Sequence, residues 1–341
     1  MALEDLTERE RQVFLSIVHS FIQTAEPVGS RYLAKHYNLN ISPATIRNVM
    51  TDLEERGLIT QPHTSAGRVP TDTGYRQYVE SLRGVVKLSS SEKRSIVEQL
   101  KRFTEDLDLI IEKSTEVLSK ISSQLGVVLA PRFNEGKLRK IDLIPLTNNK
   151  LLMVISVQSG LVKTVIVEIE QEIPSGLLEA TTQIINERIH DVSIKDLQTL
   201  FDERFRDLDL KKKRLLNALK SKTQNILQYE TNFHFAGAKN VISQPEFETK
   251  EKVSKILELL DRKDVLVRVM SEHESDGVTI VIGEENKEDL MKNCSLITTT
   301  YHLNDASGTI GVIGPTRMQY AKIIALVEFM AETLSCLVSK S

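Results

Sequence analysis

Residues 42–53, SPATIRNVMTDL, specify one short helix and the surface that it presents. Ser42 belongs to the residue types that cap helices, and Pro43 suits the first helical position. Apolar residues then recur at steps of four and three, at Ile46, Met50 and Leu53, which places them on one buried face. The opposite face carries small, polar and basic residues, namely Ala44, Thr45, Arg47, Asn48 and Thr51.

The segments around this helix complete a larger unit. Thr7 with Glu10 three residues later is the signature of a capping box and predicts a first helix, and Ser30 can cap a second one. After the third helix come residues 57–59 (GLI), a polar loop over residues 63–68 and the strand-like Val69. Three short helices followed by such a hairpin predict a winged helix-turn-helix in residues 1–83.

The exposed face of the third helix fits the recognition of DNA. The first turns of a recognition helix approach base edges, where arginine pairs with guanine and asparagine with adenine, so we predict that Arg47 and Asn48 read bases. Arg31, Tyr32 and Thr45 are better placed for phosphates, and the wing residues His63 and Arg68 for the backbone or a neighbouring groove. The predicted DNA-binding set is Arg31, Tyr32, Ser42, Ala44, Thr45, Arg47, Asn48, Thr51, His63 and Arg68.

The placement of charge supports this prediction more than the total does. The chain has 44 basic and 47 acidic residues, a net charge of −3, so no global field attracts it to polyanions. However, residues 27–51 contain Arg31, Lys35 and Arg47 without any acid, and residues 56–71 contain Arg56 and Arg68 without any acid. Winged helices also serve as protein-interaction modules, so the charge pattern favours DNA without excluding a protein partner.

The remainder of the 341 residues allows one or two further domains, at about 150 residues for each. Residues 96–121 repeat apolar residues at steps of four and three and predict one helix of about seven turns. This helix packs within its own subunit or forms a dimer seam. Segments 138–145, 151–157 and 161–169 read as strands, the last two joined at Gln158-Ser159-Gly160.

A mainly helical stretch is expected from residue 175 to about residue 260. Further strands are expected at 265–270, 277–282, 295–301 and 309–313, followed by a closing helix that Pro315 can start. The order of these elements predicts an α+β multidomain protein in which one α/β domain carries a helical insertion.

Several classes of protein are disfavoured by the composition. The two cysteines, Cys294 and Cys336, form no disulfide framework, which fits a reducing cytoplasm. The longest stretch without a charged residue, 12–25, is shorter than the roughly 20 residues of a membrane span. The seven histidines form no metalloprotease motif, and no esterase or Walker motif is present, so we expect neither an enzyme nor a cofactor or metal site.

Six stretches of the chain resemble the HrcA family of heat-inducible transcription repressors. Four lie near the N-terminus: 41–48 (ISPATIRN), 53–58 (LEERGL), 62–71 (PHTSAGRVPT) and 74–79 (GYRQYV). Two lie further on, 240–247 (NVISQPEF) and 311–318 (GVIGPTRM), so the resemblance covers nearly the whole chain. One departure is Val49, where the family often carries an acidic residue.

The resemblance implies a homodimeric repressor with three parts. These are a winged helix in 1–83, a GAF-like α/β domain in 92–171 and 236–341, and an inserted, mainly helical dimerisation domain in 172–235, with a linker at 84–91. It also implies negative regulation of class I heat-shock (chaperone) operons through the CIRCE inverted repeat, with assistance from the chaperonin GroEL.

Three alternatives remain open at this point. A metabolite-responsive repressor would bind a small effector in the GAF-like domain, since Gly308, Gly311 and Gly314 precede a helix start that could bind an anion; equally, these glycines could serve tight strand turns. The dimer interface could be the insertion or the 96–121 seam. The basic run 211–214 could be a second nucleic-acid patch or a solvated helix face.

Overall fold

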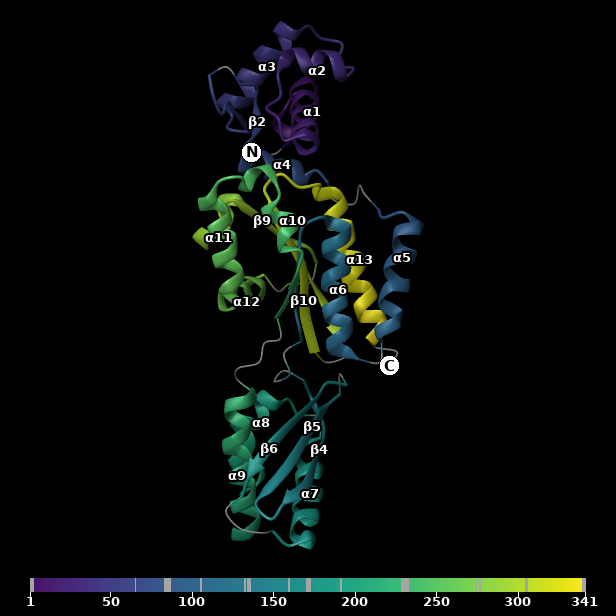
Figure 1. Cartoon of the computed structure of the whole chain (residues 1–341), viewed down its shortest axis with the longest axis vertical. Helices are drawn as coiled ribbons and strands as arrows, with labels where there is room; N and C mark the ends of the chain where they lie inside the picture. The colour runs from purple at the N-terminus through teal and green to yellow at the C-terminus, as the bar shows by residue number, and fades with distance from the viewer. Residues whose placement is uncertain are drawn as a thin grey trace.

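A computed structural model describes residues 3–64, 66–82, 87–104, 106–131, 133, 136–158, 160–169, 173–190, 192–227, 233–273, 275, 277–303 and 306–338. The first part of the predicted linker (84–86), Ser159 of the predicted hairpin turn and the predicted limit at 171–172 lie outside these residues. The described chain forms three parts arranged along one axis (Figure 1). We call them the reading head (residues 3–82), the sheet domain (87–131 and 233–338) and the inserted unit (136–227).

The reading head contains the helices and the hairpin that the sequence predicts. Its elements are η1 (Leu3–Asp5), α1 (Glu8–Thr24), α2 (Ser30–His36), α3 (Pro43–Glu55), the antiparallel pair β1 (Ile59–Thr60) and β2 (Val69–Pro70), and α4 (Asp72–Glu80). Thr7 and Glu10 form the capping box that starts α1, and the Ser42 hydroxyl accepts a hydrogen bond from the Thr45 amide (3.1 Å) at the start of α3. Local capping therefore sets where both helices begin.

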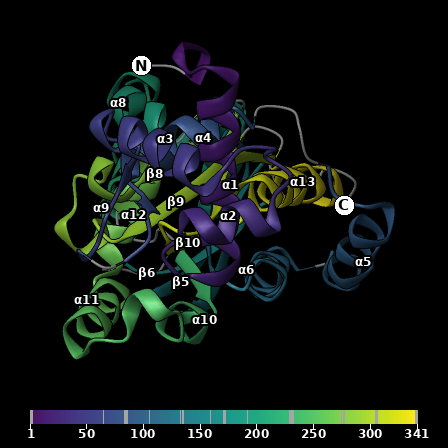
Figure 2. The same ribbon diagram turned by 90° about the horizontal axis from the view of Figure 1, so that it is seen from above.

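The sheet domain is built on five antiparallel strands in the order β7-β3-β10-β9-β8. Helices cover the sheet on both sides: α5, α6 and α13 lie together beside it in Figures 1 and 2, while α11 and α12 share a second apolar core with strands β3, β8 and β9. The strands are β3 (Leu125–Leu129), β7 (Phe233–Ala236), β8 (Thr279–Ile282), β9 (Cys294–Leu303) and β10 (Ala306–Pro315). The α-helices are α5 (Ser90–Leu100), α6 (Leu107–Ser122), α10 (Ala238–Ile242), α11 (Lys250–Asp261), α12 (Lys263–Glu272) and α13 (Tyr320–Val338), and the short 3-10 helices are η2 (Lys101–Phe103), η4 (Pro245–Phe247), η5 (Gly283–Glu285) and η6 (Asp289–Met291).

The inserted unit has its own sheet and its own core. Strands β4 (Leu138–Thr147), β5 (Lys150–Val157) and β6 (Val162–Glu168) pair only with one another among the described residues. Helices α7 (Ser175–Ile189), α8 (Ile194–Arg204) and α9 (Leu210–Leu227) complete the unit, whose buried apolar residues form a cluster separate from those of the sheet domain. The chain leaves the sheet domain after β3 and returns in β7, and these two strands are neighbours, so the insertion begins and ends at adjacent points.

This strand pairing corrects the predicted division at residue 172. That division assigned β4, β5 and β6 to the GAF-like part and made the insertion mainly helical. The alternating buried residues Leu151, Met153, Ile155 and Val157 of β5 face α7–α9, so the three strands belong to the inserted unit, which is mixed α/β. Conversely, β7, part of which had been assigned to the insertion, extends the five-stranded sheet.

Three further expectations about local structure are wrong. The single 96–121 helix is divided into α5, η2 and α6, because Asp106 caps a new helix with its side chain on the Leu109 amide (3.0 Å). Residues 265–270 lie in α12 rather than in a strand. The closing helix α13 begins at Tyr320, since Pro315 is still the last residue of β10.

A continuous apolar core joins the reading head to the sheet domain. It runs from Phe14 and Ile46 in the head through Tyr75 of α4 to Tyr320 and Leu326 of α13. The core therefore crosses the predicted boundary at residue 83. No helix in the described part of the chain is long and apolar enough to cross a membrane.

Candidate nucleic-acid interface

Helices α2 and α3 lie at the end of the molecule farthest from the inserted unit (Figure 1). They pack on each other, and α1 packs on α3 from the inner side. The buried residues of α3 are Ile46, Val49, Met50 and Leu53, and this face is held by the core of the head. The other face of α3 is thereby turned outward.

The outward face of α3 carries most of the predicted DNA-binding residues. Ser42, Ala44, Arg47, Asn48 and Thr51 are exposed, and Thr45 is half-buried. The Thr51 hydroxyl donates to the Arg47 carbonyl oxygen (3.2 Å), so this side chain is partly occupied by its own helix. Val49 is only 7% exposed, so its departure from the family pattern concerns the core of the head and not the outward face.

Helix α2 contributes a second exposed group of residues beside α3. Arg31 and Tyr32 belong to the predicted DNA-binding set, and both are exposed. The Tyr32 ring stacks on His36, with ring centroids 4.1 Å apart. Lys35 is also exposed on this helix but was not included in the predicted set. The position of Lys35 in the acid-free run 27–51 could have placed it in the DNA-binding set.

The wing differs from expectation at Arg68. We expected this residue to reach the DNA backbone or a neighbouring groove. Instead, the Arg68 guanidinium binds Glu54 of α3 (Nε to Oε2, 2.9 Å) and its side chain is only 18% exposed. Gly67 is required by close approach, since a Cβ there would lie 2.5 Å from the Val28 backbone, to which Arg68 is bridged. His63 is exposed near the end of the wing.

Ion pairing divides the five cations of the two acid-free runs into two groups. Arg56 binds Glu10 (3.1 Å) and Arg68 binds Glu54. Arg31, Lys35 and Arg47 have no ion-pair partner within the described residues, and they all lie on α2 and α3. The uncompensated positive charge is therefore concentrated on the helix-turn-helix, which suits contact with phosphates and base edges.

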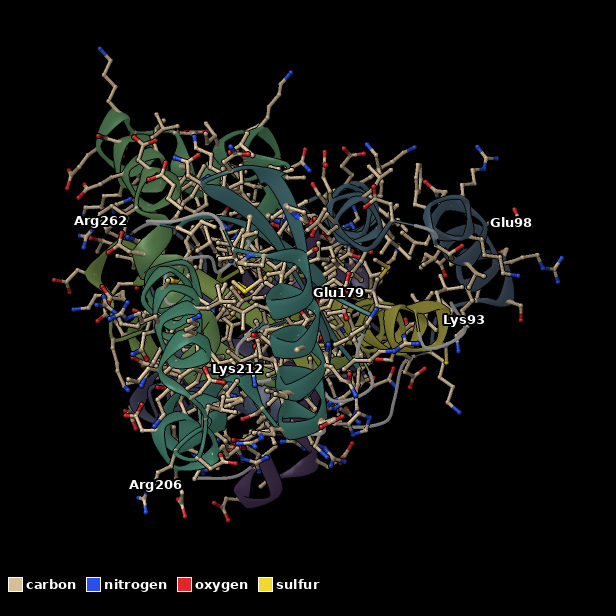
Figure 3. The ribbon with its side chains drawn as sticks, turned by 90° about the horizontal axis from the view of Figure 1, so that it is seen from below. Lys93, Glu98, Glu179, Arg206, Lys212 and Arg262 are labelled. Atoms are coloured by element: carbon tan, nitrogen blue, oxygen red, sulfur yellow. The ribbon has the colours of Figure 1, made fainter. Side chains whose placement is uncertain are left out.

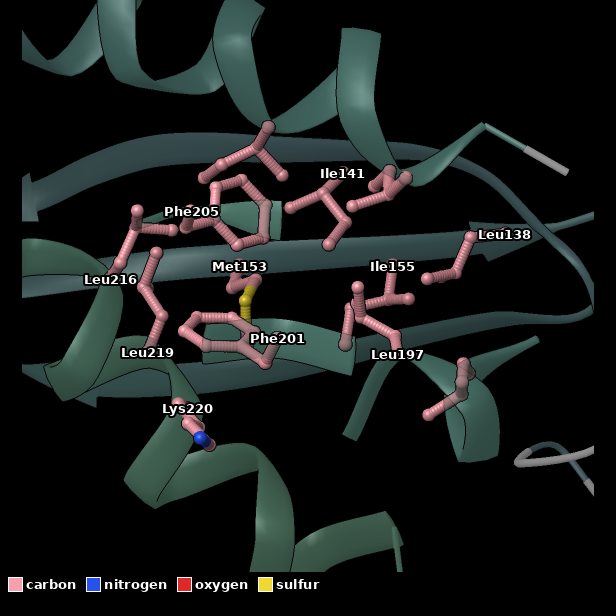
Figure 4. A pocket seen from close by; sticks show the side chains of 13 residues that line it. Leu138, Ile141, Met153, Ile155, Leu197, Phe201, Phe205, Leu216, Leu219 and Lys220 are labelled. Carbon is pink, nitrogen blue, oxygen red and sulfur yellow. The ribbon is translucent and has the colours of Figure 1, made fainter. Parts of the chain in front are cut away.

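The predicted anion site of the alternative function does not form. Gly308, Gly311 and Gly314 lie inside β10, where a Cβ on each would lie within 2.6 Å of another atom, and the following helix begins only at Tyr320. An apolar cavity of about 70 Å3 lies elsewhere, in the inserted unit, with Phe201, Phe205 and Leu216 among its lining side chains and Lys220 at one end (Figure 4). It belongs to the core of that unit.

Comparisons with known proteins identify the family. The family model described as the HrcA protein C-terminal domain matches residues 108–324. The heat-inducible transcription repressor HrcA of Chlorobium phaeobacteroides is 36% identical over 98% of this chain and 99% of its own length. The corresponding repressor of Prosthecochloris aestuarii is 36% identical over 97% of each chain.

The chain belongs to the HrcA family. These relatives are named as heat-inducible transcription repressors, and this HrcA chain matches them over almost its whole length. A solved structure described as a hypothetical protein matches 99% of both chains with a TM-score of 0.63 and 22% identity, and so shares the fold. The family match covers the reading head, the sheet domain and the inserted unit together.

Proposed function

We propose that this protein is a cytoplasmic, dimeric repressor of class I heat-shock operons that binds the CIRCE inverted repeat through Arg47, Asn48 and their neighbours. The observation that carries the proposal is the exposed face of α3, flanked by cations that have no acidic partner among the described residues. The DNA-binding set predicted from the sequence is retained, with Arg68 reassigned mainly to holding the wing against Glu54. The GAF-like character of the sheet domain belongs to the same proposal.

The open face of the three-stranded sheet supports a homodimer. One face packs on α7–α9, while the other carries Ile144, Val162 and Ile166, which are 46%, 61% and 58% exposed. Ile144 and Ile166 lie opposite Leu152 of the central strand, so an apolar row crosses all three strands. A second copy of the chain would cover this row symmetrically, as a two-fold interface does.

A two-fold dimer is what an inverted repeat requires. Each half-site then meets the same recognition helix in the same orientation. Because a dimer roughly doubles the phosphate contacts, operator affinity should fall steeply as salt rises. Loss of the dimer should therefore remove operator binding at physiological salt.

The same apolar face gives a physical reason for chaperonin assistance. A chain that has not dimerised exposes Ile144, Val162 and Ile166, and apolar strand surfaces of this kind aggregate. Only the folded, dimeric fraction binds the operator, and the apparent affinity is reduced by that fraction. GroEL would raise the fraction, and heat, by diverting the chaperonin to other clients, would lower it.

Footprinting on the chaperone-operon promoter tests this function. We expect protection of both halves of an inverted repeat, a steep loss of binding between two salt concentrations, and more active protein when purified GroEL is added. GroEL could raise either the concentration of dimers that can bind the operator or the affinity of each dimer. Stoichiometric titration with operator DNA distinguishes the two, because the proposal expects more competent dimers with an unchanged intrinsic affinity. Protection of a single half-site would contradict the proposal. So would an improved affinity for the operator at a constant concentration of competent dimers.

A further inference from the structure

The junction between the reading head and the sheet domain is organised around one arginine. Arg317 follows β10 in the turn that leads to α13, and its side chain is only 11% exposed. On the sheet-domain side, the two carboxylate oxygens of Glu246 in η4 accept hydrogen bonds from Nε (2.5 Å) and Nη2 (3.3 Å) along one edge of the guanidinium, and the Gln244 side-chain oxygen accepts a further bond from Nη2 (3.1 Å). These contacts fix the guanidinium with few alternative orientations, as paired charge-assisted hydrogen bonds do.

The remaining donor of Arg317 is directed at the reading head. Its Nη1 atom donates to the carbonyl oxygen of Ile22 in the last turn of α1 (2.9 Å). Carbonyl groups in the last turn of a helix lack partners within the helix, and the helix dipole places partial negative charge there. Helix α1 has no basic residue in its own last turn, so Arg317 supplies that charge from another part of the molecule.

Two more polar contacts cross the same junction through α4. The Asp72 carboxylate accepts the Glu284 amide (2.9 Å) and lies against Gly283, where a Cβ would be 2.0 Å from it. Arg76 donates to Glu285 (Nε to Oε1, 2.8 Å) and to the Ile280 carbonyl oxygen (2.7 Å). Arg317 thus holds α1, while η5 and β8 hold α4, so two helices of the head are fixed to the sheet domain by polar contacts.

We infer that Arg317 is a positioning residue that fixes the angle of the reading head and thereby decides which spacing between operator half-sites the dimer accepts. The inference rests on the proposed function, since spacing has meaning only for a dimer on an inverted repeat. In a dimer, the second head binds at an effective concentration set by geometry, and this concentration collapses when the heads cannot reach both half-sites. Rigid heads therefore select one spacing, whereas freely rotating heads accept several.

Arg317→Met tests the inference because it keeps much of the apolar stem and removes the guanidinium. Arg268→Met is the matched control: it removes another arginine–glutamate pair of the sheet domain, Arg268 with Glu288, at a site that forms no hydrogen bond or ion pair with the described residues of the head. Each protein is titrated with inverted repeats whose central spacer is native, or longer or shorter by one, two or five base pairs, and with an isolated half-site. Hydrogen exchange of the Glu284 amide is measured in parallel, because Asp72 of the head protects it.

Wild-type protein and Arg268→Met should prefer the native spacer by about tenfold or more. Arg317→Met should reduce that preference to about threefold or less, speed exchange at Glu284 and keep the half-site affinity. An unchanged spacer preference with unchanged exchange would overturn the inference.

Two results separate this inference from its premises. Arg317→Met alone could unfold because it leaves the Glu246 charge buried and unpaired. The double variant Arg317→Met with Glu246→Gln removes both charges, and its spacer preference and Glu284 exchange then test the inference. If the wild-type protein binds no inverted repeat, the proposed function fails and the spacing role fails with it. In that case, faster exchange at Glu284 in Arg317→Met still establishes that Arg317 fixes the head.

Discussion

Two groups of basic residues in this protein, one contiguous and one spread over two helices, have different surroundings. Residues 211–214 (KKKR) begin α9, where Lys212 binds Asp209 (3.1 Å), and the Lys220 further along binds Asp202 (2.9 Å). Figure 3 shows Arg206 of the same unit directed away from the ribbon at the edge of the molecule. On α2 and α3, by contrast, no acid lies within the run, and three cations have no ion-pair partner among the described residues.

The comparison shows that local clustering of cations does not by itself identify a binding surface. The acids that pair with Lys212 and Lys220 of the inserted unit lie just before α9 and on the neighbouring helix α8, as is usual for a solvated helix face. The cations of the helix-turn-helix remain available because residues 27–51 contain no acid, and Glu54, near the end of α3, binds Arg68 of the wing instead. The predictions below test this difference, from the largest expected effect to the smallest.

The largest effect is expected from Ile166→Lys on the open sheet face. A lysine in the apolar row places two like charges near the two-fold axis, so the dimer should dissociate and operator binding at physiological salt should be lost. Analytical ultracentrifugation and gel-shift titration measure the two effects. Gln183→Lys on exposed α7 introduces the same charge away from this face and should leave the dimer intact. If the Ile166→Lys protein is still a dimer, the dimer interface lies on another surface.

Arg47→Ala should cost about 1–3 kcal/mol on the cognate operator and relax specificity at one base position. The matched variant Arg214→Ala removes an exposed arginine from the basic run of α9 and should leave operator affinity unchanged. Titration against cognate and scrambled DNA distinguishes them. Equal losses on both sequences for Arg47→Ala would mean that this residue contacts phosphate rather than a base.

Arg31→Ala should weaken binding on all sequences and reduce the salt slope of log Kd by about one. Arg68→Ala should change that slope less, because its guanidinium is already neutralised by Glu54. Binding measured over a series of salt concentrations gives both slopes. Equal reductions in the two variants would show that Arg68 leaves Glu54 when DNA binds.

The smallest effect concerns the stability of the head at low pH. Glu10 accepts hydrogen bonds from the Thr7 amide (2.7 Å) and hydroxyl (2.8 Å), which lower the pKa of this carboxyl below its ordinary 4.5. A lowered folded pKa gives stability that is fully present above pH 4.5 and is lost as the pH falls through the folded value. Glu10→Gln should remove this pH dependence in acid unfolding monitored by circular dichroism. Thr7→Ala, which keeps the backbone amide and removes only the hydroxyl, should reduce this pH dependence in part and cost about 1 kcal/mol at neutral pH.

Much of the reading head was predictable because its signals are local. Ser42 and Pro43 start α3, and the steps between Ile46, Met50 and Leu53 decide which face is buried, so the exposure of Arg47 and Asn48 followed from a dozen residues. The same reasoning failed for residues 265–270. There, a short segment that is apolar except for Arg268 fits a strand or a buried helix equally well by composition.

The sequence by itself determined the capped helices of the head, the outward face of α3 and the family. The helices and the outward face depend on residues within a few positions of one another. The family was indicated by six stretches of sequence that resemble HrcA proteins. Only the tertiary structure decided that Arg68 is neutralised by Glu54, 14 positions away, that β4–β6 form their own sheet, and that Arg317 reaches Ile22 across 295 positions. Ion pairs and strand partners depend on which segments the fold brings together, and no local pattern encodes that choice.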